Sequence, residues 1–347
     1  MFYIHHTTCI SPQQTFGNIN IEQLNEAMNN KLQVIEPSYE GIPAGILRRM
    51  GKAVRMGVGA ALPVIQQAAT DGIIIGTANG GMEDCIKFLN QIINYEEGVL
   101  TPTNFVQSTP NAIAGQLGLL KNNKGYNITH VHRGLAFENA VIDAAMMLKE
   151  NPSRQYLLGA VDEISSYNYN IEWLAGWYKK EAIAAKQLYE SGTAASIAGE
   201  GAAMFLVNTM RTNAIAELQA ICVLHTEDEA VVARELKAFI DSNLPAGNAI
   251  DLLLTGENGD SRLLKYYTGC ETATGKDVVV ARFKHMMGEY TSAAATAVWL
   301  ACHIIREQSI PHHMLKYEAA PGSFQRVLIY NNYKGLQHSF MLVNRIL

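Results

Sequence analysis

The chain has 347 residues, 48% of them hydrophobic, and a formal net charge of −5. This length and composition allow a large buried core and argue against a disordered chain. A slightly acidic chain lacks the overall basic field that nucleic-acid binders use, so we expect no nucleic-acid partner.

Membrane and secretory functions also find no support in the sequence. Apolar stretches such as Ala293–Ala301 are shorter than the roughly 18 residues that a membrane span needs. The N-terminus has no basic segment followed by a long apolar one, so no secretory signal is readable. Five widely spaced cysteines without a CxxC motif predict reduced thiols and a cytoplasmic protein.

The first half of the chain alternates short apolar runs with segments of helical periodicity. This alternation predicts an α/β protein whose sheet carries helices on both faces. The predicted strands are 72–76, 126–131 and 156–161, and the predicted helices are 82–93 and 137–148.

The second half repeats this plan. A strand at 249–255 enters a turn and a helix at 261–267, and a strand at 277–283 leads into an apolar helix at 292–305. The repeat indicates an internal duplication, with one half at residues 1–195 and the other at 196–347. The Tyr- and Trp-rich segment at about 165–193 is predicted to be a cap over the core.

Several motifs together carry a family resemblance. They are Thr109–Gly115 with Gly125–Thr129, Gly159–Asp162, Gly199–Ala203, and Lys284–Glu289 followed by Ala293–Val298. In order and spacing they resemble the β-ketoacyl-acyl carrier protein synthases of the thiolase fold. The resemblance covers nearly the whole chain, including a final strand pair within Val327–Val343. It implies two duplicated subdomains in a layered α-β-α-β-α arrangement.

The resemblance also implies that the family's Cys-His-His catalytic centre is missing. Gly134 stands at the position of the nucleophilic cysteine, and no cysteine lies between Cys85 and Cys222. The first histidine position falls at Thr255 or Gly256, and Glu289 stands at the second. An ionised glutamate opposes an oxyanion instead of stabilising it. The family lysine is retained as Lys284, and its pairing with Glu289 is the structural interpretation of both residues.

A catalytically silent member of this family is expected to act as a chain-length factor. Such a subunit pairs with an active synthase as a heterodimer, and a homodimer is the alternative. The His132-Arg133-Gly134 elbow and the Glu289-Tyr290 pair resemble partners from aryl-polyene or flexirubin-type pigment pathways. An acyl carrier protein is the other expected partner, docking on a basic helix face formed by Arg48, Arg49, Lys52 and Arg55.

The remaining pocket candidates surround the elbow. His130 and His132 are two residues apart on a predicted strand, which places both rings on one side. They could join Glu289 around a metal, but polar packing explains them as well, and neither a metal nor a cofactor is expected. Arg133, if buried, requires a carboxylate such as Glu289 or Asp162. Phe137 could reach across a dimer interface and cap the partner's pocket.

Two other functions stay open at this point. The chain could be an acyl-thioester decarboxylase or hydrolase that uses Glu289 with His130 or His132. It could also be a free-standing acyl-binding homodimer. Sequence alone leaves open whether the chain is an enzyme.

Overall fold

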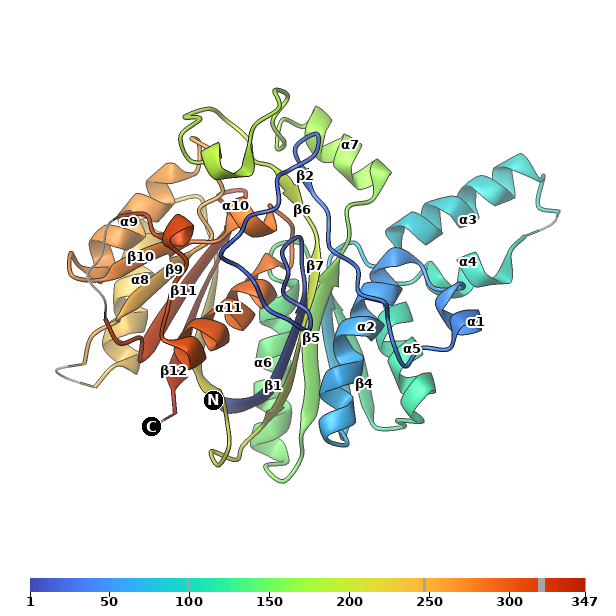
Figure 1. Ribbon diagram of the computed structural model, residues 1–347, viewed down its shortest axis with the longest axis horizontal. Coiled ribbons are helices and arrows are strands. Elements are labelled where there is room, and N and C mark those ends of the chain that lie inside the picture. The colour runs from blue at the N-terminus through green and yellow to red at the C-terminus, as the bar shows by residue number, and fades with distance from the viewer. Residues whose placement is uncertain (99, 246–247, 318–321, 347) are drawn as a thin grey trace.

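The computed structural model describes residues 1–98, 100–245, 248–317 and 322–346 (Figure 1). The first half of the chain contributes five strands to the main sheet: β1 (Phe2–Ile10), β3 (Gly72–Thr77), β4 (Tyr126–Val131), β5 (Tyr156–Asp162) and β7 (Gly201–Asn208). The second half contributes β8 (Ala216–His225), β9 (Leu252–Thr255), β10 (Val279–Arg282), β11 (Arg326–Tyr333) and β12 (Gln337–Arg345). A separate short pair joins β2 (Lys31–Leu32) to β6 (Ala198–Gly199).

The strand order of the main sheet is β10-β9-β11-β12-β8-β1-β7-β5-β3-β4. In each half the order is the first, fifth, fourth, second and third strand along the chain. The halves meet where β1 pairs antiparallel with β8, Phe2 opposite Leu218 and Ile4 opposite Ala216. The repeated topology agrees with the predicted duplication. The division at residue 195 stays a prediction; within the sheet, the repeat changes over between β7 and β8.

The helices are α1 (Ala44–Leu47), α2 (Lys52–Gln67), α3 (Met82–Asn94), α4 (Pro102–Gln107), α5 (Ala112–Lys121), α6 (Ala136–Glu150), α7 (Ser166–Leu174), α8 (Glu229–Asn243), α9 (Leu264–Thr274), α10 (Lys284–Met287) and α11 (Ala293–Glu307). Two 3₁₀ turns, η1 (Ala185–Gln187) and η2 (His312–Met314), complete them. In the part of the chain that the structure describes, no helix is long and apolar enough to span a membrane.

Alternating side chains place the helices in layers. In β3, Ile73 and Ile75 pack into an outer core with α2 and α5, whereas Ile74 packs into the central core with α6 and α11. In β9, Leu253 packs into the opposite outer core with α8 and α9, and Leu252 faces the centre. This gives the expected α-β-α-β-α arrangement. The central α11 is apolar on nearly every face because it is buried on every side.

Most predicted elements lie where the periodicity placed them, including both central helices. Sequence reasoning missed β1, β7, β8, α4, α5 and α8, and it identified β11 and β12 only through the resemblance. The predicted cap holds α7 and η1 and lies over one end of the main sheet (Figure 1). The helical pair α3 and α4, called the arm below, extends away from the body beside β4's half (Figure 1).

Candidate functional site

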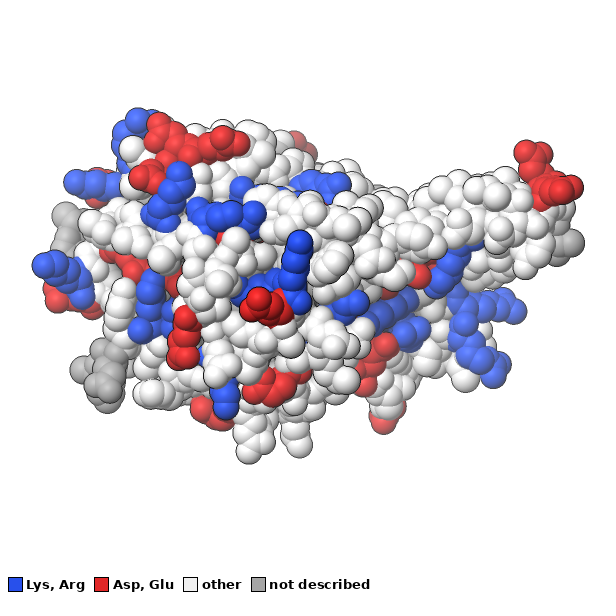
Figure 2. Space-filling view, turned by 90° about the horizontal axis from the view of Figure 1, so that it is seen from above, with Lys and Arg blue, Asp and Glu red and all other residues white. Residues whose placement is uncertain are grey.

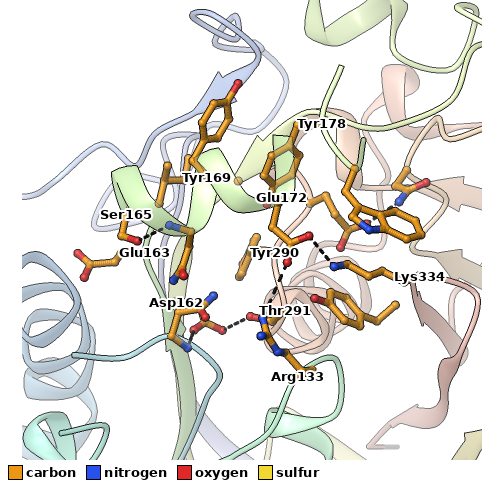
Figure 3. A pocket seen from close by; sticks show the side chains of 18 of the residues that line it. Arg133, Asp162, Glu163, Ser165, Tyr169, Glu172, Tyr178, Tyr290, Thr291 and Lys334 are labelled. Carbon is orange, nitrogen blue, oxygen red and sulfur yellow. Dashed lines mark hydrogen bonds and ion pairs between the residues drawn. The ribbon is translucent and has the colours of Figure 1, made fainter. Parts of the chain in front are cut away.

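A narrow cleft with a cavity volume of about 50 Å³ lies under the cap, at the ends of β5 and β11. The cap, the end of β5, the segment after α10 and the β11–β12 turn all contribute side chains (Figure 3). Its lining includes Arg133, Asp162, Glu172, Asn258, Glu289 and Tyr333. The resemblance implied that the family's catalytic groups converge at this place.

Gly134 is buried and lies against Tyr333, which lines the cleft. Its amide donates a hydrogen bond to Oε1 of Gln337 at 2.8 Å. A Cβ atom added at Gly134 would lie 2.1 Å from Cβ and 2.5 Å from Cγ of Tyr333. The tyrosine therefore occupies the space in which a cysteine nucleophile would begin, and the position accepts no side chain while Tyr333 stays in place.

Glu289 is held in a buried ion pair. Its Oε1 accepts from Nζ of Lys284 at 2.6 Å and its Oε2 from Nδ2 of Asn258 at 2.7 Å. The Lys284 side chain is fully buried. Gly288, at φ +75°, ends α10 in a conformation that glycine adopts readily, and this turn brings Glu289 back to Lys284. The geometry agrees with the structural interpretation of the pair.

Asn258, not Thr255, faces the cleft from the turn after β9. Thr255 Oγ1 accepts from the Glu257 amide at 3.1 Å and so closes its own turn. The assignment of Thr255 to the site is therefore corrected. Sequence reasoning missed Asn258 because the turn is short and its register against the family was uncertain. What marks Asn258 as a site residue is the hydrogen bond from its side-chain amide to Glu289, and this contact exists only in the folded protein.

The predicted internal salt bridge of Arg133 is wrong. The Arg133 side chain is 64% exposed, and its Nη1 lies 3.8 Å from Oε1 of Glu172 on α7. Neither expected carboxylate is available. Glu289 is already paired, and Asp162 accepts from the Thr77 hydroxyl and from two backbone amides. The Glu172 carboxylate also binds Nζ of Lys334 at 2.5 Å, which ties the β11–β12 turn to the cap (Figure 3).

The two histidines of the elbow do not form a site together. His130 Nε2 lies 2.9 Å from Oδ2 of Asp143 on α6, and neither histidine lines the cleft. β4 ends at Val131, so the strand alternation behind the same-side prediction does not extend to His132. Within residues 1–98, 100–245, 248–317 and 322–346, no group of three His, Cys, Asp or Glu side chains could hold a metal ion.

Phe137 does not reach a dimer interface. Its side chain is fully buried, and its ring centroid lies 5.9 Å from that of Phe205 on β7. The first turn of α6 points inward at this position because the helix is the central layer. The idea that Phe137 caps a partner's pocket is therefore wrong.

The prediction that Arg48, Arg49, Lys52 and Arg55 line one face of a single helix is also wrong. α1 ends at Leu47 and α2 begins at Lys52, with Arg48 and Arg49 in the break between them. Lys52 binds Glu200 at 2.5 Å, and Arg55 binds both oxygens of Glu36 at 2.5 and 2.8 Å. Only Arg48 and Arg49 remain as exposed cations of this set.

Sequence reasoning also missed a buried carboxyl group, that of Glu138 in the first turn of α6. Its side chain is fully buried, and Oε1 accepts from the Ser339 hydroxyl at 2.7 Å. Among the described residues, Oε2 has no hydrogen-bond partner. Burial raises the pKa of Glu138 from 4.5 to about 7, against the opposing effect of the Ser339 hydrogen bond.

Replacing Glu138 with glutamine tests this buried acid. A carboxyl whose pKa is raised by folding stabilises the protein fully below its unfolded pKa, and this contribution is lost as the pH rises through about 7. We expect Glu138→Gln and the natural protein to be similarly stable near pH 4.5. At pH 8 the variant gains up to roughly 3 kcal/mol relative to the natural protein. Urea unfolding at both pH values measures the difference; no gain at pH 8 would contradict the assignment.

Comparisons with known proteins agree with this geometry. The profile of the β-ketoacyl synthase N-terminal domain matches residues 22–235. A β-ketoacyl synthase from Burkholderia phymatum STM815 superposes with TM-score 0.80 at 12% identity, over 100% of this chain and 99% of that one. The ketosynthase ApeO in complex with its chain length factor ApeC, from Xenorhabdus doucetiae, gives TM-score 0.75 at 12% identity, over 99% and 98% of the two chains.

A third structure, the AntDE:AntF complex of a type II polyketide acyl-carrier protein with its ketosynthase, gives TM-score 0.78 at 11% identity over 99% of each chain. No curated protein matches the sequence. The structural similarities at this identity establish the thiolase-type fold, and the profile covers more than half of the chain. The chain belongs to the β-ketoacyl synthase family.

Proposed function

We propose that this chain is a non-catalytic, ketosynthase-like subunit that pairs with an active β-ketoacyl synthase and shapes its acyl site. The observation that carries the proposal is the contact between Tyr333 and Gly134, which fills the nucleophile position of an otherwise complete family fold. The Lys284–Glu289 pair supports it, because this carboxylate has no capacity to stabilise an oxyanion.

The open edge of the sheet supports pairing with a second subunit. β4 is the last strand of the sheet, and Val131 at its end is 54% exposed. An unpaired edge strand offers backbone donors and acceptors to a partner strand. By the family resemblance, subunits pair through this strand, so we assign it to the interface.

The arm extends this surface with apolar side chains. Its exposed apolar residues are Leu89, Ile93, Phe105 and Val106, each at least half exposed. Seen from above, the arm shows a long uncharged stretch between its base and acidic residues at its tip (Figure 2). Exposed apolar groups in such density are typical of a surface that another protein covers. Because Phe137 is buried, we assign to the arm, instead of Phe137, the contact that reaches the partner.

The proposal also includes an acyl carrier protein as a second partner and a broad class of biosynthetic pathway. Arg48 and Arg49 are the exposed cations that could attract an acidic acyl carrier protein, an attraction that salt weakens. Lys52 and Arg55 contribute less because their charges are already paired. We place the subunit in cytoplasmic fatty-acid, polyketide or aryl-polyene chain building on the resemblance and on similarity to a synthase with its chain length factor.

No observation favours the alternative enzyme function. A thioester decarboxylase or hydrolase built on Glu289 would need a free carboxylate and a histidine nearby. Glu289 is engaged by Lys284 and Asn258, and His130 is bonded to Asp143 outside the cleft.

Co-expression with an intact Cys-His-His synthase, taken first from neighbouring reading frames, tests the proposal. We expect a stable heterodimer that extends acyl chains only as the pair, while this chain alone releases no carbon dioxide from malonyl thioester. A synthase that works without this chain and does not co-purify with it would refute the partner role. A homodimer that binds acyl thioester, with no effect on any synthase, would favour the free-standing alternative.

Substituting Val131 with lysine tests the proposed interface. A desolvated charge at the end of β4 is expected to weaken heterodimer formation at least tenfold, a change of about 1.4 kcal/mol or more. Met210→Lys is the matched control, because Met210 is 62% exposed and lies in the turn between β7 and β8. Both variants should remain folded. Equal affinity of the two variants in analytical ultracentrifugation would remove β4 from the interface.

A further inference from the structure

A series of partly buried hydrogen bonds joins the cap to α10, to η2 and to the segment around Ile21. Tyr189 of the cap lies 3.1 Å from Nδ1 of His285 on α10. Nε2 of His285 lies 2.8 Å from Nδ1 of His313 in η2. Nε2 of His313 lies 2.8 Å from the carbonyl oxygen of Ile21. Four segments distant in sequence are thereby joined through two imidazole rings.

The partners determine where each proton lies. The Ile21 carbonyl only accepts, so His313 carries its proton on Nε2 and its Nδ1 accepts. His285 must then donate from Nε2, which leaves its Nδ1 to accept from the Tyr189 hydroxyl. With both rings neutral, every hydrogen bond in the series has one donor and one acceptor, and donation runs from Tyr189 through His285 and His313 to the Ile21 carbonyl. The Tyr189 oxygen also accepts from the backbone amide of His285 at 3.1 Å.

Two additional protons have no place in this arrangement. A single one fits on Nδ1 of His313, provided that His285 accepts it on Nε2 and donates from its own Nδ1 to the Tyr189 oxygen. A charge on both rings would set the Nδ1–H of His313 against the Nε2–H of His285. The charged groups nearby do not help. Arg282 lies over the Tyr189 ring at 3.8 Å, and its partner Glu257 is shared with Lys316. In the part of the chain that the structure describes, no carboxylate lies within ion-pair distance of either ring.

Burial also disfavours a positive charge on His285. It lowers the pKa of His285 from 6.5 to about 3, and the nearby His313 and Arg282 act in the same direction. The neutral form is therefore favoured in the closed state. Any opened state in which the His285 ring reaches water binds a proton there from pH 6.5 downward, so acid favours opening.

These contacts hold the second half of the cap. η1 and the residues after it have little regular structure of their own, and Leu188 packs with Leu32 and Ile197 in a small separate cluster. Tyr189 anchors this segment to α10, the helix that carries Lys284. The segment is also held by this cluster and by the amides of Ile183 and Ala185, which donate to Asn30 and Glu26. None of these contacts involves the main sheet, so loss of the Tyr189 anchor would loosen the segment and leave the sheet folded.

We propose that the Tyr189–His285–His313–Ile21 chain is a proton-sensitive latch that keeps the second half of the cap closed at neutral pH and releases it on acidification. All parts of the latch belong to this one polypeptide, so the proposal does not depend on the proposed partner role. Its ligand is the proton, and its moving part is the segment 182–191.

Hydrogen exchange of the full chain, followed by mass spectrometry from pH 7.5 to 5, tests the latch. After correction for intrinsic exchange, protection of residues 182–191 should fall about tenfold per pH unit below pH 6.5 for one proton bound on opening. Protection of the central helix α11 should not change over this range. Equal protection of 182–191 at pH 7.5 and 5.5, or a parallel loss in α11, would overturn the proposal.

Two histidine variants separate the latch from general effects of acid. His313→Leu should lower protection of 182–191 already at pH 7.5 and remove most of its pH dependence. His312→Leu changes the exposed neighbouring histidine and should keep the natural pH profile. A natural profile in His313→Leu, or its loss in His312→Leu, would contradict the latch.

Nitrogen NMR of ¹⁵N-histidine-labelled protein keeps the test decisive if His313→Leu does not fold. Both His285 and His313 should give the signals of neutral rings protonated on Nε2 at pH 7.5. A charged ring, or a ring protonated on Nδ1, at either position would overturn the proposed chain.

Discussion

Replacing Gly134 with cysteine is expected to destabilise the protein by about 3 kcal/mol and to restore no condensing activity. The new Cβ would lie 2.1 Å from Cβ of Tyr333, an atom that moves only with the backbone. Overpacking of a closed site costs about 1–3 kcal/mol, at the upper end where nothing can yield. Urea unfolding measures the loss, and release of carbon dioxide from malonyl thioester measures the activity.

Two variants of Tyr333 make this test specific. Tyr333→Ala removes the ring but keeps the Cβ atom that clashes, whereas Tyr333→Gly removes both. The cost of Gly134→Cys should therefore stay high in the alanine background and fall below about 1 kcal/mol in the glycine background. A similar cost in both backgrounds would show that Tyr333 is not what closes the position.

Replacing Lys284 with methionine is expected to cost about 3–5 kcal/mol of unfolding free energy. The substitution leaves the carboxylate of Glu289, whose side chain is 13% exposed, with a hydrogen bond from the Asn258 amide but without its lysine. Removing one partner of a buried ion pair is costly because the remaining charge stays buried without compensation. Thermal and urea unfolding at pH 7 measure the loss.

The double variant Lys284→Met/Glu289→Gln should recover most of this stability. It leaves no charge, and glutamine can still accept a hydrogen bond from Asn258. Arg234→Ala is the control for an ordinary ion pair. Arg234 pairs with Glu235 on the surface, with its side chain 68% exposed, and its loss should cost less than about 1 kcal/mol. A cost for Lys284→Met as small as that of Arg234→Ala would mean that the pair contributes little.

The two experiments bear on one conclusion about the cleft. In an active family member this place is expected to hold a nucleophile and hydrogen-bond donors. Here it holds an aromatic ring in the nucleophile's space and a carboxylate neutralised by a buried lysine. Both features leave this place without room for a nucleophile and without a free carboxylate.

The sequence alone was sufficient to predict the α/β class and an internal repeat, and the family resemblance added the prediction that the catalytic groups are missing. Periodicity of apolar residues is a local property, so the runs at 72–76, 126–131 and 292–305 were sufficient to predict β3, β4 and α11. The absence of a cysteine between Cys85 and Cys222 is likewise independent of the fold. The Lys284–Glu289 pair could be predicted from the sequence because the two residues are only five positions apart.

Only the tertiary structure decided which side chains face the cleft. Tyr333 lies nearly two hundred positions after Gly134, and nothing local to either residue predicts their contact. Arg133 turned outward because Asp162 and Glu289 had already bound other donors. Phe137 turned inward because α6 is a central layer. The direction and pairing of a side chain depend on the elements packed around it, and a sequence pattern does not contain that information.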